Sequence, residues 1–417
     1  MSGSPGVGEL LEHQFRHQAG RMAAHLARLL GPSHLDLAEE SVQDAMVRAL
    51  ETWPYDGIPD NPPAWLFRVA HNSAISVVRR RQLLGSKTEA LVAEISRAAM
   101  PAIGEPEIEE QLRDDELRMI FMCCHPAIPR DSSVALSLKI VGGFGVREIA
   151  RAFWDEEAAV AQRLVRAKRQ IRDHRLTLEM PRGPELGERL ASVLDVLYFM
   201  FNEGYSAHQG EQLIRQDICM EALRLGTLIA RSSISTPLVD ALVALMALQA
   251  ARLPARVDDS GELVPLEQQD RGRWNRELIA IGFHHFDLSM RGDDVSEYHV
   301  QAAIAATHAR ASSSAEIEWR TILTLYDQLL ELNSSPVVVL NRAVALARVK
   351  GPEAALEAIQ CLDDSKLRDY HLLLAARGHL LLDLGRPAAA ADCFRAALEQ
   401  ACSEPERRFL RRMMSSC

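Results

Sequence analysis

The sequence has few aromatic residues, no long uncharged apolar run and scarce β-branched runs. Aromatic residues make up 5% of its 417 residues, whereas alanine and leucine are abundant. This composition disfavours sheets and favours helices. The longest apolar stretch, Leu238 to Leu253, is shorter than a membrane span and contains Asp240 and Gln249. We therefore expect an all-α protein that does not cross a membrane.

The sequence also lacks paired cysteines and enzyme motifs. Its seven cysteines, without a signal peptide, predict reduced intracellular thiols. The segment Cys123 to His125 suggests a metal, but no second Cys or His pair lies at ligand spacing. Glu203 and the pair His284–His285 could serve acid-base chemistry, yet no nucleophile motif or Gly-rich phosphate loop accompanies them. We expect no metal, no cofactor, no catalytic residue and no enzyme activity.

Charge is unevenly distributed along the chain. The formal net charge of −10 argues against a protein that coats nucleic acid non-specifically. Two basic islands nevertheless occur: residues 66–87 carry five bases and no acid, and residues 158–175 carry six bases and one acid. Between them, residues 105–116 hold seven acids. A charge run is most often a solvated face, so neither island alone identifies a nucleic-acid site.

The first 84 residues predict a small helical bundle. Leu35, Ala38, Val42, Ala45, Met46 and Ala49 recur at helical spacing, opposite a face rich in acids and amides. The segment Trp53 to Asp60 contains proline and glycine and predicts a loop. Asn61 and Pro62 give a cap and first-turn signal for the next helix, which runs to about Leu84.

A second helical unit is expected from Ile108 to about Leu178. It contains a short helix, Val146 to Phe153, a break at Trp154 and Asp155, and a longer basic helix from Glu156. This order is typical of a helix-turn-helix. Asp155 is expected to cap the second helix.

The segment Pro181 to Pro184 marks a boundary, and the sequence after it predicts further helices. A shift of 34 residues lays Gly351 over Gly385 and Ala354-Ala355 over Ala388-Ala389. That period is the tetratricopeptide period, with small residues where paired helices touch. Ala-rich hairpins can match by chance, so two copies leave the repeat a hypothesis.

Several motifs resemble sigma factors of the extracytoplasmic-function type. Ala38 to Leu50, Ala64-Trp-Leu-Phe-Arg-Val-Ala-His-Asn72 and Val78-Arg-Arg-Arg81 resemble region 2, which binds polymerase and the downstream promoter element. Val146-Arg-Glu-Ile-Ala150 and Val160 to Lys168 resemble region 4, the helix-turn-helix that reads the upstream element. The two matches occur in the family's order, one linker apart.

Three further motifs are similar to a subgroup with a long C-terminal extension containing tetratricopeptide-like repeats. They are Cys123-Cys-His-Pro126, Phe201-Asn-Glu-Gly-Tyr205 and Leu266-Glu-Gln-Gln-Asp-Arg271. The resemblance implies the following division: region 2 at residues 1–84, an acidic linker at 85–108, region 4 at 109–180, a helical extension at 185–290 and tetratricopeptide-like repeats at 291–417.

The resemblance and the chemistry of the residues together select candidate contacts. Contacts to bases, or close to bases, are assigned to Gln162, Arg163 and Arg166, because arginine and amide side chains in the major groove bind base edges. Phosphate or solvent contacts are assigned to Arg147, Lys168, Arg169 and Arg172. Trp53 and Tyr55 suit stacking on an unstacked base, with core packing as the alternative for either ring. The downstream element is assigned to Arg68, Asn72, Arg79 and Arg80, and core polymerase to Glu40, Gln43 and Asp44.

The resemblance implies a cytoplasmic sigma factor whose partners are core RNA polymerase and promoter DNA. The C-terminal extension is expected to regulate it by binding a regulatory protein or a small ligand. The alternative is a conventional helix-turn-helix regulator joined to a repeat domain, which would leave residues 10–84 unexplained. An enzyme within residues 185–290 is the third class.

Overall fold

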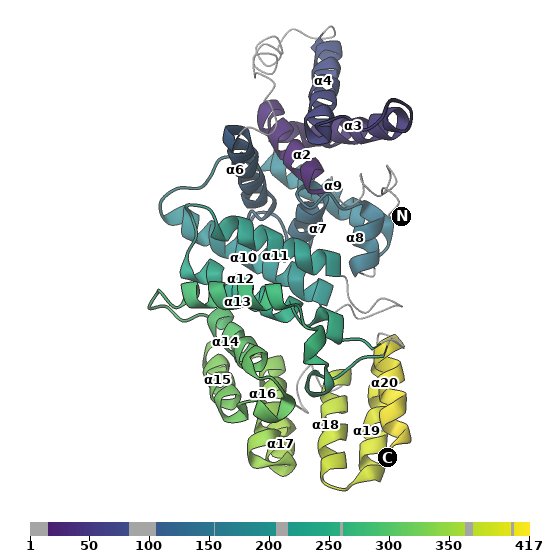
Figure 1. The fold of residues 1–417 in the computed structure, drawn as a ribbon, viewed down its shortest axis with the longest axis vertical. Helices are drawn as coiled ribbons and strands as arrows, with labels where there is room; N and C mark the ends of the chain where they lie inside the picture. The colour runs from purple at the N-terminus through teal and green to yellow at the C-terminus, as the bar shows by residue number, and fades with distance from the viewer. Residues whose placement is uncertain are drawn as a thin grey trace. The chain divides into compact units, whose positions relative to one another are not determined.

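A computed structural model describes residues 16–82, 106–153, 155–205, 216–258, 262–362, 370–401 and 404–417. Within these stretches every regular element is a helix, and the sole strand-like contact is an isolated antiparallel bridge between Val257 and Leu263. The predicted all-α fold class is therefore confirmed. The chain divides into two compact units, residues 1–199 and 200–417, and this boundary falls inside a helix (Figure 1).

Three helices that pack against one another open the first unit. They are α2 (Arg16–Leu30), α3 (Leu35–Asp56) and α4 (Pro62–Gln82), with the 3-10 turn η2 (Pro32–His34) between the first two. Helix α3 buries the predicted apolar face, although Met46 is only half-buried. The predicted cap of α4 is also present, because Asn61 Oδ1 accepts a hydrogen bond from the Ala64 amide at 3.1 Å.

Four more helices complete most of the first unit: α6 (Pro106–Cys123), α7 (Arg130–Ile140), α8 (Val146–Phe153) and α9 (Glu157–Asp173). Helix α2 packs against both α6 and α7, and α9 packs against α7, α8 and η2. Of the acidic linker predicted at 85–108, residues 85–105 lie outside the described part of the chain, and the rest belongs to α6.

A glycine allows α2 to approach the end of α7 closely. A Cβ atom on Gly20 of α2 would lie 1.9 Å from the carbonyl oxygen of Val141, at the end of α7. No side chain larger than hydrogen fits there without moving one backbone away from the other. The position of α2 on α7 therefore depends on this glycine.

Helix α10 (Pro184–Tyr205) begins in the first unit and ends in the second. In the first unit, the Arg189 guanidinium donates to the Phe121 carbonyl at 2.7 Å, and the Ser192 hydroxyl donates to the Cys124 carbonyl at 2.8 Å. The sequence placed the domain boundary at residues 181–184. The first half of α10 instead packs onto α6 and the turn after it.

The second unit continues with α11 (Gln216–Ala230), α12 (Pro237–Ala250), α13 (Arg276–Ser289) and α14 (Glu297–Arg310). Helix α12 packs against the other three and is apolar on all sides. Among the described residues, the stretch Pro237–Ala255 is long and apolar enough to span a membrane, yet 78% of it is buried inside the protein. Such burial is typical of a core helix.

Helical hairpins form the rest of the second unit: α15 (Trp319–Leu332), α16 (Pro336–Lys350), α17 (Pro352–Ile359), α18 (His371–Asp383), α19 (Pro387–Gln400) and α20 (Glu404–Ser415). The last three lie side by side (Figure 1). Gly351 and Gly385, superposed by the predicted repeat, both adopt positive φ at the turn between two paired helices. The two hairpins are thus built alike, and their membership of a repeat family stays a prediction.

We predict that Gly20→Ala lowers the free energy of unfolding of the first unit by roughly 1–3 kcal/mol, because an added methyl group forces two backbones apart. Urea unfolding followed by circular dichroism measures the change. Gly187→Ala, in α10 of the same unit, is the matched control. Nothing lies within 4 Å of its added Cβ, so this variant should be neutral or stabilised by up to about 1 kcal/mol. Equal stabilities of the two variants would contradict the close contact.

Candidate nucleic-acid interface

The outer face of α3 carries the three residues assigned to polymerase. Glu40, Gln43 and Asp44 are all exposed, and Asp44 accepts a hydrogen bond from the Ser73 hydroxyl of α4 at 2.8 Å. Farther along the helix, Val47 and Leu50 are 52% and 48% exposed. An acidic face that continues into exposed aliphatic side chains suits a protein partner. Neither aliphatic residue was predicted from the sequence. Both are apolar side chains outside the predicted buried face of this helix, and that position could have indicated a contact surface.

The two aromatic candidates for base stacking differ in accessibility. The expected loop at residues 53–60 begins later than predicted, because α3 continues through Pro54 to Asp56. Trp53 consequently lies in the core at 3% exposure, with its ring edge-on to Trp65 at a centroid distance of 5.5 Å. Tyr55 is 89% exposed. In this arrangement only Tyr55 can stack on a base, and Trp53 fits the core-packing alternative.

Helix α4 presents its predicted contact residues on its exposed surface. Arg68, Asn72 and Arg79 are separated by 4 and 7 positions, so they follow one face of the helix, and Arg80 lies beside them. All four are exposed. The face combines guanidinium groups with an amide over about 16 Å of helix axis, taking 1.5 Å for each residue. Such a face can contact phosphates and unpaired base edges together.

The short helix and the basic helix of the predicted helix-turn-helix are α8 and α9, with residues 155 and 156 before α9. Trp154 of the predicted break lies outside the described residues. Asp155 does not cap α9 as predicted, because the cap position is Glu156 and its side chain makes no capping bond. Asp155 instead accepts from the Glu156 amide at 3.0 Å and pairs with Arg163 at 2.6 Å. The Asp155 carboxylate thus ties the start of α9 to Arg163, the first arginine of the helix.

The basic side chains of α9 lie on the two sides of a buried apolar stripe, which is formed by Val160, Leu164, Ala167 and Ile171. On one flank, Arg163, Arg166 and Arg169 line a groove of about 490 Å³ beside the start of α7. Gln162 and Val165 are exposed next to it, and Val165 is 63% exposed. The side chains chosen for base contact therefore share one accessible side of the helix. Val165, which could contact a thymine methyl group, was missed because only polar and basic side chains were selected.

On the other flank, Lys168 binds α3 within the same unit. Its ammonium donates to Asp36 Oδ1 at 2.6 Å and to Glu39 Oε2. Lys139 of α7 approaches Glu39 at 3.7 Å, and Arg172 approaches Asp36 at 3.9 Å. Lys168 and Glu39 are only 17% and 11% exposed. Lys168, predicted to contact phosphate, is here the link between the basic helix and the acidic helix.

The charge state of Lys168 follows from these neighbours. Burial acts to lower its pKa, but Glu39 and Asp36 outweigh burial and raise the pKa above its usual value. A raised lysine pKa means that the ion pair stabilises the fold fully below about pH 10.4, the ordinary value, and loses this effect only above the folded value. The ion pair between Lys168 and the acids of α3 is therefore fully formed at neutral pH.

The remaining phosphate candidates are on the surface. Arg147 of α8 lies 3.8 Å from Glu157, and Arg169 lies 3.2 Å from Asp173. All four side chains are more than half exposed. Exposed pairs of this kind contribute little to stability, so both arginines can exchange their carboxylates for phosphates at small cost.

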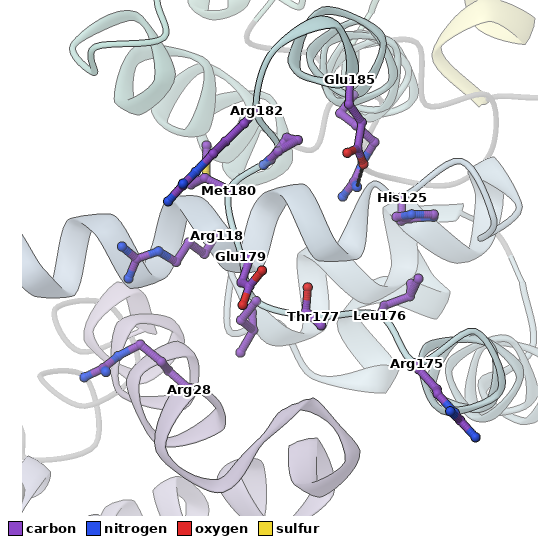
Figure 2. Close-up of a pocket in the computed structure, with 13 residues that line it drawn as sticks. Arg28, Arg118, His125, Arg175, Leu176, Thr177, Glu179, Met180, Arg182 and Glu185 are labelled. Carbon is purple, nitrogen blue, oxygen red and sulfur yellow. Dashed lines mark hydrogen bonds and ion pairs between the residues drawn. The ribbon is translucent and has the colours of Figure 1, made fainter.

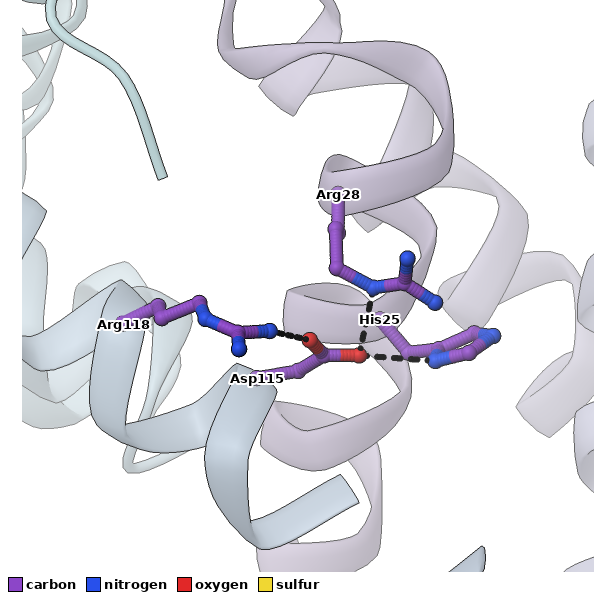
Figure 3. Close-up of polar contacts among 4 residues, drawn as sticks. All are labelled: His25, Arg28, Asp115 and Arg118. Atoms are coloured by element: carbon purple, nitrogen blue, oxygen red, sulfur yellow. Dashed lines mark hydrogen bonds and ion pairs between the residues drawn. The ribbon is translucent and has the colours of Figure 1, made fainter. Parts of the chain in front are cut away.

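A second set of ion pairs ties α2 to α6. Asp115 is 2% exposed and accepts from His25 at 2.9 Å, from Arg28 at 2.9 Å and from Arg118 at 3.0 Å (Figure 3). The next residue, Glu116, is fully buried and lies 3.2 Å from Arg21. The acidic run at residues 105–116 is thus not wholly a solvated face.

Three of the residues weighed for other chemistry are buried, whereas His125 and Glu203 are half-buried and His284 is exposed. Cys123 and Cys124 are buried, and burial raises the pKa of both thiols, that of Cys124 to about 12. His285 contacts Asp240 at 2.7 Å across α13 and α12. Among the described residues, no group of three His, Cys, Asp or Glu side chains could hold a metal ion.

Comparison with known proteins gives two family matches. Residues 15–83 match sigma-70 region 2, and residues 189–290 match a family of unknown function, DUF6596. An uncharacterized protein from Rhizobium meliloti (strain 1021) is 42% identical over 383 residues, which cover 91% of this chain and 89% of the relative. No solved structure matches. The first match takes in α2, α3 and α4, which carry the exposed acidic and basic faces.

We predict that Lys168→Ala lowers the free energy of unfolding of the first unit by roughly 1–3 kcal/mol, because Glu39 loses the nearer of the two lysines that compensate its burial. The matched control is Arg169→Ala, whose exposed ion pair should be worth less than about 1 kcal/mol. Urea unfolding at neutral pH compares the variants. If Arg169→Ala costs as much as Lys168→Ala, the link between α9 and α3 is not a stabilising contact.

Proposed function

We propose that this chain, which belongs to the sigma-70 family, is a sigma factor of the extracytoplasmic-function type. It binds core RNA polymerase and directs promoter-specific initiation of transcription in the cytoplasm, without a cofactor or enzyme activity of its own. The observation that carries the proposal is the pair of exposed faces on α3 and α4, inside the segment that matches sigma-70 region 2.

In this proposal the outer face of α3 binds polymerase. Acidic and amide groups at Glu40, Gln43 and Asp44 give a polar rim, and the exposed Val47 and Leu50 supply apolar area. Helix α4 then lies next to the enzyme with its arginines toward the downstream element. Tyr55, which is 89% exposed in the last turn of α3, is placed to stack on a base that leaves the duplex.

Helix α9 is proposed to read the upstream element through its accessible flank. Arg163 and Arg166 line a groove, while Lys168 and Arg172 are turned toward α3. The flank that would enter the major groove is therefore the one left free by the packing of α9 on α3. A conventional helix-turn-helix regulator would explain this flank but not the sigma-70 region 2 segment.

In vitro transcription with core polymerase, followed by mapping of the start sites, tests the activity. The chain should bind core polymerase and yield discrete start sites, and core polymerase alone should not. Asp44→Arg should weaken binding to core at least tenfold with no change in helix content, because it places a cation in an acidic face. The absence of discrete start sites, or of binding to core, would exclude a sigma factor.

We predict that Arg166→Ala changes which upstream sequences are used. A lost bidentate contact to a base costs about 1–3 kcal/mol, or roughly 5- to 150-fold, at one position of the site. Arg169→Ala is the control, because a lost phosphate contact weakens all sequences alike and lowers the salt dependence by about one charge. Binding to a library of upstream sequences measures both effects. Identical sequence preferences in wild type and Arg166→Ala would contradict base contact by α9.

The C-terminal helices are proposed to regulate the sigma module through a regulatory protein or a small ligand. Stacked hairpins such as α16–α17 and α18–α19 offer extended surfaces for a partner. The cut that tests this proposal should follow Tyr205, because the first half of α10 bonds to Phe121 and Cys124 of the first unit. Removal of all residues after Arg182 would instead strip those contacts.

We predict that the chain ending at Tyr205 differs several-fold from the full chain in transcription from a fixed promoter, while keeping the helix content of its remaining helices. The measurement is the initiation rate at equal occupancy of core polymerase. The comparison is made with and without cell extract as a source of partners. Equal initiation rates for the two chains under both conditions would show that the C-terminal helices do not regulate initiation.

A further inference from the structure

A large pocket opens in the first unit, apart from the faces assigned to polymerase and DNA. Its volume is about 800 Å³, within the usual range of about 300–1,000 Å³ for small-molecule sites. Four segments line it: α2, the end of α6 with His125 in the turn after it, the connection at residues 175–182 and the start of α10 (Figure 2). None of these segments belongs to the outer faces of α3, α4 or α9.

The lining carries an excess of positive charge. Its five guanidinium groups belong to Arg28, Arg118, Arg175, Arg182 and Arg189, and its two carboxylates to Glu179 and Glu185. Asp115 adds one more carboxylate behind Arg28 and Arg118. Cations therefore still outnumber anions, in a chain whose net charge is −10. A cleft that concentrates positive charge in an acidic protein attracts anions selectively.

Three of the guanidinium groups extend to the same side of the pocket. Figure 2 shows Arg28, Arg118 and Arg182 reaching toward one side, whereas Arg175 points away from them. Arg28 uses only its Nε, and Arg118 only its Nη1, in the bonds to Asp115. Arg182 is exposed and makes no ion pair within the described residues. Several N–H donors on this side are consequently available to a ligand.

A fourth arginine carries an unused donor in the wall of the pocket. Arg189 is 11% exposed and bonds to Glu185 and to the Phe121 carbonyl. Its Nε is buried and has no hydrogen-bond partner. Because Arg189 also lines the pocket, its guanidinium adds a positive charge to the wall.

The rim of the pocket is held in a fixed conformation. Arg175 follows α9 with φ 51°, which makes it the sole residue other than glycine with positive φ among the described residues. The Leu176 amide donates to the Ile171 carbonyl at 2.9 Å, which closes the end of α9. Leu178 and Pro181 are buried. The connection that carries Arg182 is therefore anchored at several points before any ligand binds.

We propose that this pocket binds a small phosphorylated molecule. Its phosphate or diphosphate group lies against Arg28, Arg118 and Arg182, and its organic part lies along Leu176 and Met180. Planar guanidinium groups bind phosphate oxygens in pairs and with defined geometry. This inference goes beyond the proposed function and does not rest on it, because it uses neither the polymerase face nor the DNA-reading flank.

The bound anion would join parts of the chain that are far apart in sequence. Arg28 and Arg118 are already held together by Asp115, and Arg182 comes from the connection between α9 and α10. A phosphate held by all three would fasten that connection to α2 and α6. Ligand binding should therefore raise the thermal stability of the protein.

Isothermal titration calorimetry on the full chain tests the proposal, with pyrophosphate as the probe and citrate as a carboxylate anion of similar charge. We expect saturable binding of pyrophosphate, at least tenfold tighter than that of citrate, and a rise in Tm of several degrees. Arg182→Gln, at an exposed position, should weaken pyrophosphate binding at least tenfold. Arg182→Lys should fall between this variant and wild type, because it keeps the charge but loses paired donors.

The matched control is Arg395→Gln on α19, which also removes one exposed arginine. It should bind pyrophosphate as wild type does. The proposal is overturned if pyrophosphate at millimolar concentration gives neither heat nor a Tm shift, if citrate binds equally well, or if Arg182→Gln and Arg395→Gln behave alike. Because polymerase and DNA are absent, these outcomes leave the sigma-factor proposal untouched.

Discussion

The buried carboxylates of α6 are the constraint on which the first unit depends. Asp115 and Glu116 are almost completely removed from solvent, and each is compensated by cations that α2 supplies. A carboxylate in such a site without its cation costs several kcal/mol, so α2 and α6 cannot separate cheaply. Gly20, which has no side chain, also lets the backbone of α2 lie against the end of α7. Together these contacts fix α2, α6 and α7, against which the helices with the exposed faces pack: α3 and α4 on α2, and α9 on α7.

The position of α9 follows from the same principle of compensated charge. Its apolar stripe packs on α7 and α8, while Lys168 binds the acids at the start of α3. One flank of α9 makes ion pairs with α3, while on the other flank Arg163 and Arg169 pair only with the nearby Asp155 and Asp173. Of the five cations in this helix, those that bind α3 therefore set its orientation.

The sequence allowed the helices to be predicted but not their long-range partners. Periodicity identified the buried face of α3, and Asn61 with Pro62 located the start of α4, because both signals are local. Lys168 and Asp36 are 132 positions apart, so no spacing rule could assign their ion pair. Trp53 was misplaced because proline at position 54 predicts a helix end, whereas α3 continues through it. The pocket at Arg182 also escaped prediction, since its lining comes from four separate segments.

The edge-on packing of Trp53 and Trp65 gives this protein a built-in optical reporter. Their ring centroids are 5.5 Å apart, and one ring comes from α3 and the other from α4. Indoles this close couple their electronic transitions, so near-ultraviolet circular dichroism of the pair depends on how these two helices are packed. The three other tryptophans lie at positions 154, 274 and 319, outside this helix pair. Opening of the α3–α4 pair could therefore be followed in the unlabelled protein.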